Sequence, residues 1–426
     1  MTDRIETLVE RDARHQWHPY TQHALEPAFL PVVGAKGAEL ELGDGRVLID
    51  AISSWWTSLH GHGEPALIEA MATQAETLDH VLFAGTTHEP AVALGEEIAA
   101  VAPEGLSRIF FSDNGSTAVE VALKMAFHRH VLEGASQRRV FVALEGSYHG
   151  DTFGAMAIGD PDPFFEPFAP LLFRVVRVAP EIEKVVEAFE SLGDEAAGMI
   201  LEPRVQGAGG MLMHSDEFLR GVRRVTAERS LPLIADEVMT GFGRTGSLFA
   251  CLGAGIAPDL MCLAKGLTGG IMPMAATLAT EAYYEAFLAE DRRRAFFHGH
   301  SFTAHPIGCA VARASLELTL GRRVPERLDA IGARIEARIV SALGESPKIT
   351  ALRRRGGIVA FDLVPPSGTE SGYLSDLTPA LRARAVESGV LLRPLGNVVY
   401  AMPPACLSDA QADRVADVMV ELTELV

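Results

Sequence analysis

The chain has 426 residues, of which 48% are hydrophobic and 22% are charged, and its formal net charge is -19 at pH 7. This composition is that of a soluble globular protein, and the length favours two or three structural parts over a single core. Because nucleic acids and anionic membranes would repel so acidic a chain, we expect neither as a partner.

Cysteine and histidine patterns argue against disulfides and against a metal site. The four cysteines show no CxxC spacing, which suits a reducing compartment. The clusters HGHG (60–63) and HGH (298–300) lack the i, i+4 spacing and the cysteine neighbours of a zinc site. The N-terminal stretch lacks the apolar core of a signal peptide, and no apolar run is long enough to span a membrane. We therefore expect a cytoplasmic protein without a metal.

The N-terminal segment, residues 1–59, is predicted to be an arm beside a substrate site and part of a smaller domain. The stretch AELELGDGRVLID (38–50) predicts two strands that meet at a DG turn. All three tryptophans of the chain, Trp17, Trp55 and Trp56, lie in this segment.

The middle of the chain, residues 60–324, alternates apolar runs with longer segments of helical periodicity, such as SDEFLRGVRRVTAERS (215–230). This alternation indicates an α/β fold whose mostly parallel sheet is covered on both faces. We expect it to form a large domain. The apolar runs are RIFFS (108–112), RVFVAL (139–144), GMILE (198–202), LPLIAD (231–236) and DLMCLA (259–264).

The pattern changes in the last part of the chain, residues 325–426. RLDAIGARIEARIVSAL (327–343) predicts a long amphipathic helix. GGIVAFDL (356–363), VLLRPLG (390–396) and VVYAMPP (398–404) predict strands. We therefore expect a smaller α+β domain here.

The turn after the first apolar run of the middle part is a candidate phosphate site. Ligands of open parallel sheets bind at the carboxyl ends of the strands. Gly115 and Ser116 lie where such a strand leads into a helix, and the free N–H groups of a helix start attract a phosphate. The alternative is that Asn114 or Ser116 only caps the helix.

Three further residues follow other runs at the same expected edge. Lys265 ends an apolar run, and burial there would lower its pKa and make its amine nucleophilic. Asp236 could pair with a pyridinium nitrogen, or could be a helix cap or a salt-bridge partner. Tyr148 could cover a planar ring, or could be rim packing. A phosphate turn, an aromatic, an acid and a lysine together meet the needs of pyridoxal 5'-phosphate.

One motif offers a different interpretation. GFGRTG (241–246) matches the dinucleotide fingerprint in its letters, which would suit a nicotinamide-dependent oxidoreductase. That fingerprint follows a strand directly and opens a long helix. Here EVMT (237–240) separates the motif from the end of the predicted strand, and the segment after the motif contains glycines and a proline that would interrupt a helix. We therefore treat this alternative as poor.

The chain resembles the class III aminotransferases of the fold-type I pyridoxal phosphate group over nearly its whole length. The motifs that carry the resemblance are NGSTAVEVALKMA (114–126), GSYHGDTFGAM (146–156), ILEPRVQGAGGM (200–211), LIADEVMTGFGRTG (233–246), LAKGLTGG (263–270) and HGHSFTAHPIGCA (298–310).

The resemblance implies a role for each cofactor residue. By it, Lys265 binds the cofactor aldehyde and Asp236 pairs with the ring nitrogen. Tyr148 covers the ring. Ser301 falls where the family has a threonine that reaches a phosphate across a dimer interface. His300, the residue before Ser301, stands where a proline is common in the family. The resemblance also implies that Gly115 and Ser116 hold the phosphate and that the enzyme is a homodimer with its active sites at the interface.

Further motifs narrow the resemblance to members that make 7,8-diaminononanoate in biotin biosynthesis. WHPYTQ (17–22), SSWWTSLHGHG (53–63) and LLRPLGNVVYAMPP (391–404) resemble their signatures. The implied donor is S-adenosylmethionine and the implied acceptor is 8-amino-7-oxononanoate. Arg393 could clamp the acceptor's carboxylate, or could be a surface arginine. The candidate substrate-binding residues are Tyr20, Trp55, Trp56, Arg244, Gly299, Arg393 and Tyr400.

Other functions stay open at this stage. Within the family, the chain could act on ornithine, 4-aminobutyrate or a diamine, and lysine could replace S-adenosylmethionine as the donor. The aromatic N-terminal motif argues against ornithine, 4-aminobutyrate and a diamine as substrates. A binding protein without catalysis would not need the lysine, the aspartate, the tyrosine and the phosphate turn together.

Overall fold

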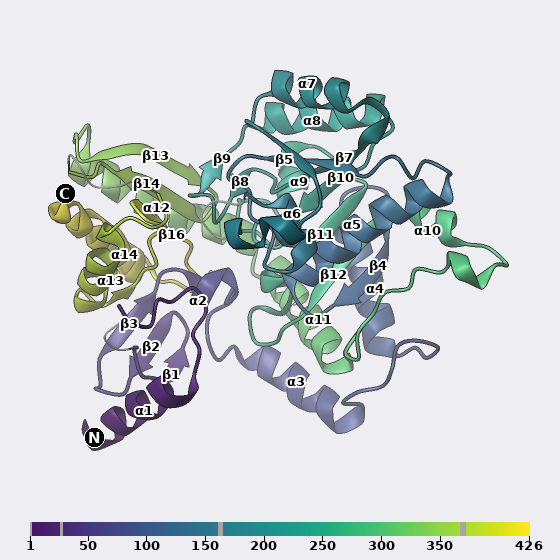
Figure 1. Cartoon of the computed structure of the whole chain (residues 1–426). Coiled ribbons are helices and arrows are strands. Elements are labelled where there is room, and N and C mark those ends of the chain that lie inside the picture. The colour runs from purple at the N-terminus through teal and green to yellow at the C-terminus, as the bar shows by residue number, and fades with distance from the viewer. Residues whose placement is uncertain (1, 26–28, 161–164, 367–371) are drawn as a thin grey trace.

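The computed structural model describes residues 2–25, 29–160, 165–366 and 372–426. Its larger part surrounds a seven-stranded sheet of order β4-β12-β11-β10-β7-β5-β6 (Figure 1). All neighbours pair in parallel except β12, which runs antiparallel to β11 and β4. The expected mostly parallel α/β sheet is therefore confirmed. The strands are β4 (Leu106–Ser112), β5 (Val140–Leu144), β6 (Val175–Val178), β7 (Ala196–Leu201), β10 (Leu233–Asp236), β11 (Leu260–Leu263) and β12 (Ala275–Thr280).

Helices cover both faces of this sheet, as a buried parallel sheet requires. Alternate residues of β11 show the division, since Leu260 and Cys262 join one hydrophobic core and Met261 and Leu263 join another. The first face carries α5 (Gly115–Leu132) and α10 (Glu281–Phe287). The second carries α4 (Glu89–Val101), α7 (Ile182–Leu192), α8 (Asp216–Glu228) and α11 (Pro306–Gly321).

The N-terminal strands and the C-terminal region form one body beside the large sheet, on the left of Figure 1. The strands β1 (Val32–Lys36), β2 (Glu39–Leu42) and β3 (Val47–Asp50) are antiparallel, and β15 (Val390–Leu391) adds to β3 in parallel. A second sheet has the order β13-β14-β16 and is antiparallel. Its strands are β13 (Ile349–Arg355), β14 (Ile358–Leu363) and β16 (Val398–Ala401), and the helices of this body are α12 (Val324–Leu343), α13 (Leu377–Glu387) and α14 (Asp409–Glu421).

Helix α12 connects the two bodies. Its first turns place Val324 and Leu328 in the core of the large sheet, and the following turns place Ile331 and Ile335 in the core of the C-terminal body. The apolar residues recur every three or four positions, so one stripe of the helix serves both cores in succession.

The remaining elements are short or peripheral. None of the helices in the described ranges is long and apolar enough to cross a membrane. The short or peripheral elements are α1 (Thr2–His15), α2 (Ser53–Trp56), α3 (Pro65–Thr77), α6 (Phe153–Ile158), α9 (Ala250–Ala254), β8 (Val205–Gln206), β9 (Leu212–Met213), and the 3-10 turns η1 (Glu166–Leu171), η2 (Gly193–Glu195), η3 (Lys265–Thr268), η4 (Arg292–Arg294) and η5 (Leu422–Leu425).

Candidate active site

A pocket of about 410 Å³ lies at the carboxyl edge of the large sheet. The turn after β4, the loop after β5, the end of β10 and the residue after β11 all contribute to its wall. The structure thus brings together six residues that the sequence predicted separately for the cofactor site or the substrate site. They are Trp56, Gly115, Ser116, Tyr148, Asp236 and Lys265.

Lys265 opens η3 with a positive φ of 44°, which is a left-handed conformation that a side chain makes costly. Its Nζ atom lies 4.7 Å from the centroid of the Trp56 ring. Burial lowers the pKa of this amine below its usual value, although the carboxylates of Asp236 and Glu202 act in the opposite direction. A larger fraction of the amine is therefore uncharged and nucleophilic than in a free lysine.

The glycines after Lys265 serve the packing of the chain as well as the pocket. A Cβ on Gly270 would lie 2.7 Å from the carbonyl carbon of Thr57 and 2.8 Å from the amide nitrogen of Ser58. The loop that carries the lysine can therefore lie directly on the backbone that follows Trp56. Gly270 also lines the pocket, so one residue borders both.

Asp236 is buried and held from two sides. Its carboxylate accepts a hydrogen bond of 3.0 Å from the amide of Val238, and a bond of 2.7 Å joins it to Nδ1 of His149. The other ring nitrogen of His149, Nε2, is buried without a hydrogen-bond partner among the described residues. His149 lies directly after Tyr148 in the quoted motif GSYHGD, yet nothing in the sequence alone singled it out.

Glu202 is a second site residue that the sequence analysis missed. It lies just after β7, and its carboxylate accepts hydrogen bonds from the amides of Gly207 at 2.8 Å and Tyr148 at 3.2 Å. Burial raises the pKa of this carboxyl to about 7, with His149 lowering it and Asp236 raising it. The side chain therefore fixes the loop that carries Tyr148.

The turn between β4 and α5 shows which of its polar residues caps the helix. Asn114 caps the helix, since its side chain accepts from the amide of Thr117 at 3.0 Å and the Thr117 hydroxyl accepts from the amide of Asn114 at 3.2 Å. Ser116 is thus not the cap, and its hydroxyl accepts instead from the amide of Asp151 at 3.2 Å. The amides of Gly115 and Ser116, in the first helical turn, have no acceptor within the helix, so they are suited to an anion.

Glycines keep this turn open. A Cβ on Gly115 would lie 2.6 Å from Cγ1 of Val238, and a Cβ on Gly150 would overlap the Ser116 side chain. Gly150 also has a φ of 120°, which favours glycine. Open backbone at a helix start, the aspartate, the unpaired His149 nitrogen and the lysine together fit a phosphorylated cofactor that has an aromatic ring nitrogen and an aldehyde.

Tyr148 lies where the cofactor pocket meets a second pocket. Its hydroxyl is 2.9 Å from that of Tyr20, and Tyr20 donates to the carboxylate of Asp151. Burial raises the pKa of both phenols. Both tyrosines therefore stay protonated and can hold or pass a proton along this chain of hydroxyls.

The second pocket has a volume of about 340 Å³ and shares Trp56, Thr57, Tyr148 and Lys265 with the first. Five of the seven candidate substrate residues line it. The guanidinium carbon of Arg393 lies 4.5 Å from the centroid of the Trp55 ring. The complete lining is Tyr20, Trp55, Trp56, Thr57, Tyr148, Asp151, Ala208, Lys265, Tyr373, Arg393, Leu395 and Tyr400.

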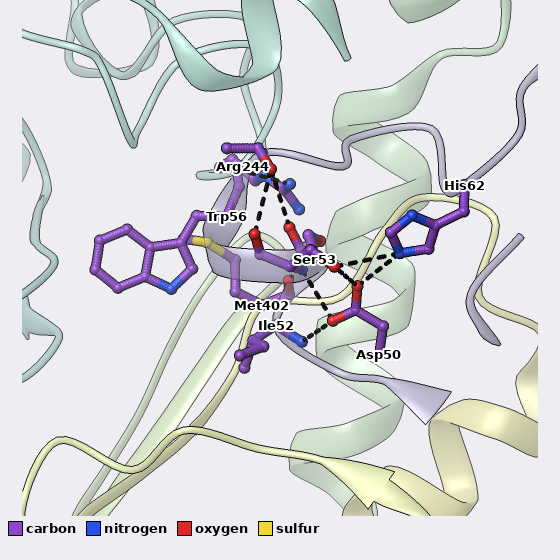
Figure 2. A network of polar contacts seen from close by, with 9 residues as sticks. Asp50, Ile52, Ser53, Trp56, His62, Arg244 and Met402 are labelled. Atoms are coloured by element: carbon purple, nitrogen blue, oxygen red, sulfur yellow. Dashed lines mark hydrogen bonds and ion pairs between the residues drawn. The ribbon is translucent and has the colours of Figure 1, made fainter. Parts of the chain in front are cut away.

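Both tryptophans stand on an unusual turn, Ser53–Trp56, which we call the tryptophan turn. Its four residues have φ values of 49°, 46°, 75° and 72°, all in the left-handed region. For residues with a side chain this conformation costs about 1–2 kcal/mol each. Figure 2 shows that the Trp56 ring projects from one side of the turn, while Asp50 and His62 lie on the other. The Trp56 indole donates to the Tyr400 hydroxyl at 3.0 Å.

Arg244 does not line either of these two pockets. It is 2% exposed and donates to the carbonyls of Pro403 at 2.7 Å and Trp56 at 3.1 Å (Figure 2). Burial lowers the pKa of this guanidinium to about 10. In this single chain Arg244 therefore contacts backbone, and a direct substrate contact stays a prediction.

Gly299, His300 and Ser301 lie in the connection between α10 and α11, outside the same two pockets. Gly299 and Ser301 are exposed, and His300 is half-buried. Substrate binding by Gly299 and the roles of His300 and Ser301 at a phosphate stay predictions. The GFGRTG stretch (241–246) lies in turns before α9, a helix of five residues, so it does not open a long helix.

Comparison with known proteins adds the following. The family model described as aminotransferase class-III matches residues 20–422. The chain is 49% identical over 428 residues to the adenosylmethionine-8-amino-7-oxononanoate aminotransferase of Synechococcus elongatus, covering 96% of this chain and 98% of the relative. The enzyme of that name from Geobacter sulfurreducens is 39% identical over 445 residues, covering 97% of this chain and 96% of the relative.

Solved structures agree with the sequence relatives. The crystal structure of adenosylmethionine-8-amino-7-oxononanoate aminotransferase from Methanocaldococcus jannaschii has a TM-score of 0.94 at 32% identity, covering 99% of both chains. An (S)-enantioselective omega-transaminase from Thermomicrobium roseum has a TM-score of 0.92 at 27% identity, covering 98% of both chains.

Proposed function

The chain belongs to the class-III aminotransferases, and on this premise we propose that it transfers the amino group of S-adenosylmethionine to 8-amino-7-oxononanoate. The product of this reaction is 7,8-diaminononanoate, and the reaction is a step of biotin biosynthesis. The observation that carries the proposal is the pair of pockets that share Lys265, with the aromatic and arginine residues of the expected substrate signatures lining the second.

The enzyme uses pyridoxal 5'-phosphate, which when bound stores the electron pair released at the donor's α-carbon and carries the amino group between the two half-reactions. The residues of the first pocket fit this cofactor. Lys265 would hold its aldehyde, Asp236 its ring nitrogen, and the amides of Gly115 and Ser116 its phosphate. Tyr148 would lie against the ring.

Asp236 and Lys265 do the acid–base work of the proposed mechanism. Asp236, oriented by His149, places a negative charge where a protonated ring nitrogen is needed. The Lys265 amine would move the proton from the donor's α-carbon to the former aldehyde carbon of the cofactor in the first half-reaction, and from that carbon to the former carbonyl carbon of the acceptor in the second. Its lowered pKa lets it accept that proton, and the nearby carboxylates stabilise its charged form.

The second pocket explains how one site can serve two different substrates in turn. Faces of tryptophan and tyrosine suit both the aliphatic chain of the acceptor and the sulfonium of the donor. Arg393 presents a planar fork that suits the acceptor's carboxylate. Each substrate would exclude the other, so the reaction would follow a ping-pong order.

We also infer a homodimer in which Ser301 completes the partner's phosphate site. Two facts support this. Ser301 belongs to the family motif HGHSFTAHPIGCA (298–310), yet it is exposed and lies outside both pockets of its own chain. A largely apolar groove of about 670 Å³ near this segment, lined by Phe83, Val92, Tyr284, Phe287 and Phe296 among others, suits a subunit contact.

The free cysteines support a cytoplasmic location.

The decisive experiment is a half-reaction on the purified, cofactor-loaded protein. S-adenosylmethionine should convert the visible absorption band of the cofactor to the near-ultraviolet band of its amine form, and 8-amino-7-oxononanoate should restore the first band. Lysine, ornithine, 4-aminobutyrate and a diamine serve as competing donors. If one of these competing donors changes the spectrum and S-adenosylmethionine does not, the assignment of S-adenosylmethionine as the donor is wrong.

A matched variant tests the lysine. In Lys265→Ala with cofactor bound, the visible band should be lost, because no amine is present to form the Schiff base. An unchanged band would remove Lys265 from its role.

A further inference from the structure

The tryptophan turn is stabilised by contacts from outside the turn, because its own backbone conformation is unfavourable. Its internal hydrogen bonds run from the amide of Trp56 to the carbonyl of Ile52 at 2.8 Å and from that of Thr57 to Ser53 at 2.9 Å. These bonds do not offset four left-handed residues. Side chains from three other segments therefore decide whether the turn persists.

The N-terminal end of the turn is held by one carboxylate. Asp50 accepts from the amide of Ser54 at 2.9 Å, from the Ser54 hydroxyl at 2.7 Å and from the amide of Ile52 at 3.3 Å. The Nε2 atom of His62 lies 2.9 Å from the same carboxylate (Figure 2). Burial would raise the pKa of Asp50, but the bonds from His62 and Ser54 lower it below its usual value, so the group stays ionised.

Two further donors hold the turn, one at its first residue and one at its last. The Ser53 hydroxyl donates to the carbonyl of Met402 at 2.8 Å, and Arg244 donates to the carbonyl of Trp56 at 3.1 Å. Asp50 lines neither pocket at the active site. It nevertheless pairs with Leu391 across β3 and β15, two residues before Arg393. Asp50 is thus tied to both the turn and the strand that leads to Arg393.

We propose that Asp50, together with Ser54 and His62, is a positioning residue for the reaction. It holds the tryptophan turn in its left-handed form, and it thereby sets where Trp56 stands beside the Lys265 amine and where Trp55 stands beneath Arg393. The proposal rests on the proposed function, since it assigns these two tryptophans to the substrate pocket.

The first test uses kinetics of the holoenzyme. Asp50→Asn keeps the shape of the side chain but places an NH2 group where an acceptor is needed. We expect KM for the acceptor to rise about tenfold, the scale of one lost charge-assisted hydrogen bond. The affinity for pyridoxal phosphate should change less, because the residues proposed to hold the cofactor, such as Asp236, Lys265 and Ser116, do not lie on the turn.

Variants of the partners keep the proposal testable if Asp50→Asn does not fold. His62→Leu should raise KM in the same direction, and His62→Gln, which keeps a side-chain N–H donor, should restore most of it. Ser54→Ala should have a smaller effect, because the backbone amide still donates to Asp50. Thr226→Val is the control, since it removes a buried hydrogen bond within α8, away from the pocket, and should leave KM unchanged.

The second test needs no substrate. In a Trp17→Phe background the only tryptophans are Trp55 and Trp56, so their near-ultraviolet circular dichroism reports the turn in the apo-protein. We expect Asp50→Asn and His62→Leu to weaken this signal while the far-ultraviolet spectrum is kept. Thr226→Val in the same background should not change it.

The outcomes separate the two proposals. If the wild type converts its substrates but these variants keep both KM and the tryptophan signal, Asp50 has no positioning role. Loss of activity in proportion to the folded fraction alone, with KM unchanged, leads to the same conclusion. If the wild type itself fails in the half-reaction, the proposed function is wrong, and the dichroism comparison still decides whether Asp50 holds the turn.

Discussion

Burial shifts the pKa of Lys265 and of Glu202 more than their charged neighbours do. It lowers the pKa of Lys265 and raises that of Glu202, although each has a partner of opposite charge nearby. The lysine gains reactivity from this. Glu202 lines the cofactor pocket and accepts hydrogen bonds from the amides of Tyr148 and Gly207, so its shift also has a consequence for stability.

Replacing Glu202 should therefore change how stability depends on pH. Its pKa of about 7 in the folded chain lies above the ordinary 4.5, so the folded state binds this proton more tightly than the unfolded state. The stability that the carboxyl contributes is fully present below pH 4.5 and is lost as the pH rises through 7. In Glu202→Gln, the free energy of unfolding relative to the wild type should rise across that window and level off above it.

Urea unfolding of the apo-protein at a series of pH values would measure this difference. Both proteins contain the same other titrating groups, so subtraction isolates Glu202. A difference that does not depend on pH would contradict the assigned pKa.

At the scale of the element, the chemistry lies in turns and at the ends of strands and helices. The large sheet places its strand ends side by side, and the turn before α5, the loop after β5, η3 and the tryptophan turn present the groups that line the pockets. Several of these turns work only because glycine leaves room for a neighbouring segment.

A pair of substitutions tests this for the phosphate turn. In Gly115→Ala, the new methyl group would lie 2.6 Å from Cγ1 of Val238 and should push the start of α5 away from the cofactor. We expect the dissociation constant of pyridoxal phosphate to rise about tenfold, which corresponds to about 1.4 kcal/mol. Adding Val238→Ala removes the clash, and the double variant should recover most of the affinity. Equal affinity in the single and double variants would show that the clash is not the cause.

Sequence reasoning succeeded where a residue's role depends on its own strand. The five apolar runs became strands, and Asp236 and Lys265 lie at or just past the ends of two of them. It missed β6, whose VVRV contains an arginine that donates to the carbonyls of Gly159 and Ala157. It also missed β12, which consists largely of alanine and threonine and lacks a strong apolar run.

The sequence could not predict features that depend on distant segments. Ser-Ser-Trp-Trp contains no glycine to signal a left-handed turn, and the donors and acceptors that stabilise it come from residues far along the chain, such as Arg244 and Met402. Glu202 ends a predicted apolar run, which is a signal, whereas His149 lies further along a loop and carried none. The partners of both became visible only in the structure.

At the scale of the molecule, the two bodies are joined by α12, whose apolar residues pack into both cores. Gly332 lies in this helix, and a Cβ there would overlap the carbonyl of Gly356 between β13 and β14. The substrate pocket draws on both bodies, since Lys265 follows the large sheet and Arg393 follows β15. The packing of α12 therefore bears on the geometry between these two residues.

Two glycine-to-alanine changes should have opposite effects on stability. Gly332→Ala should destabilise the protein by about 1–3 kcal/mol, because the helix must shift away from the adjacent backbone. Gly321→Ala at the end of α11 meets no atom within 4 Å and should stabilise it by about 0.4–1 kcal/mol. Thermal melts of both variants check this, and destabilisation of equal size in both would contradict the packing argument.

Subunit mixing tests the proposed dimer. Ser301→Glu should weaken cofactor binding, because its charge would repel the phosphate, and Lys265→Ala should lack activity. If Ser301 acts across the interface, a mixed dimer contains one site with both native residues, and activity should return on refolding the two variants together. No recovery in isolated mixed dimers would show that Ser301 acts within its own chain or not at all.

The pairing of β3 with β15 has a consequence for how the protein is made. The strand that carries Asp50 leaves the ribosome early, whereas its partner at residues 390–391 and the Met402 carbonyl that anchors Ser53 leave it near the end. The large sheet has all of its strands by residue 280, so it can collapse first. The tryptophan turn cannot be stabilised until synthesis is nearly finished, so a nascent chain could place Asp236 and Lys265 at the edge of the sheet well before Trp56 completes the wall of either pocket.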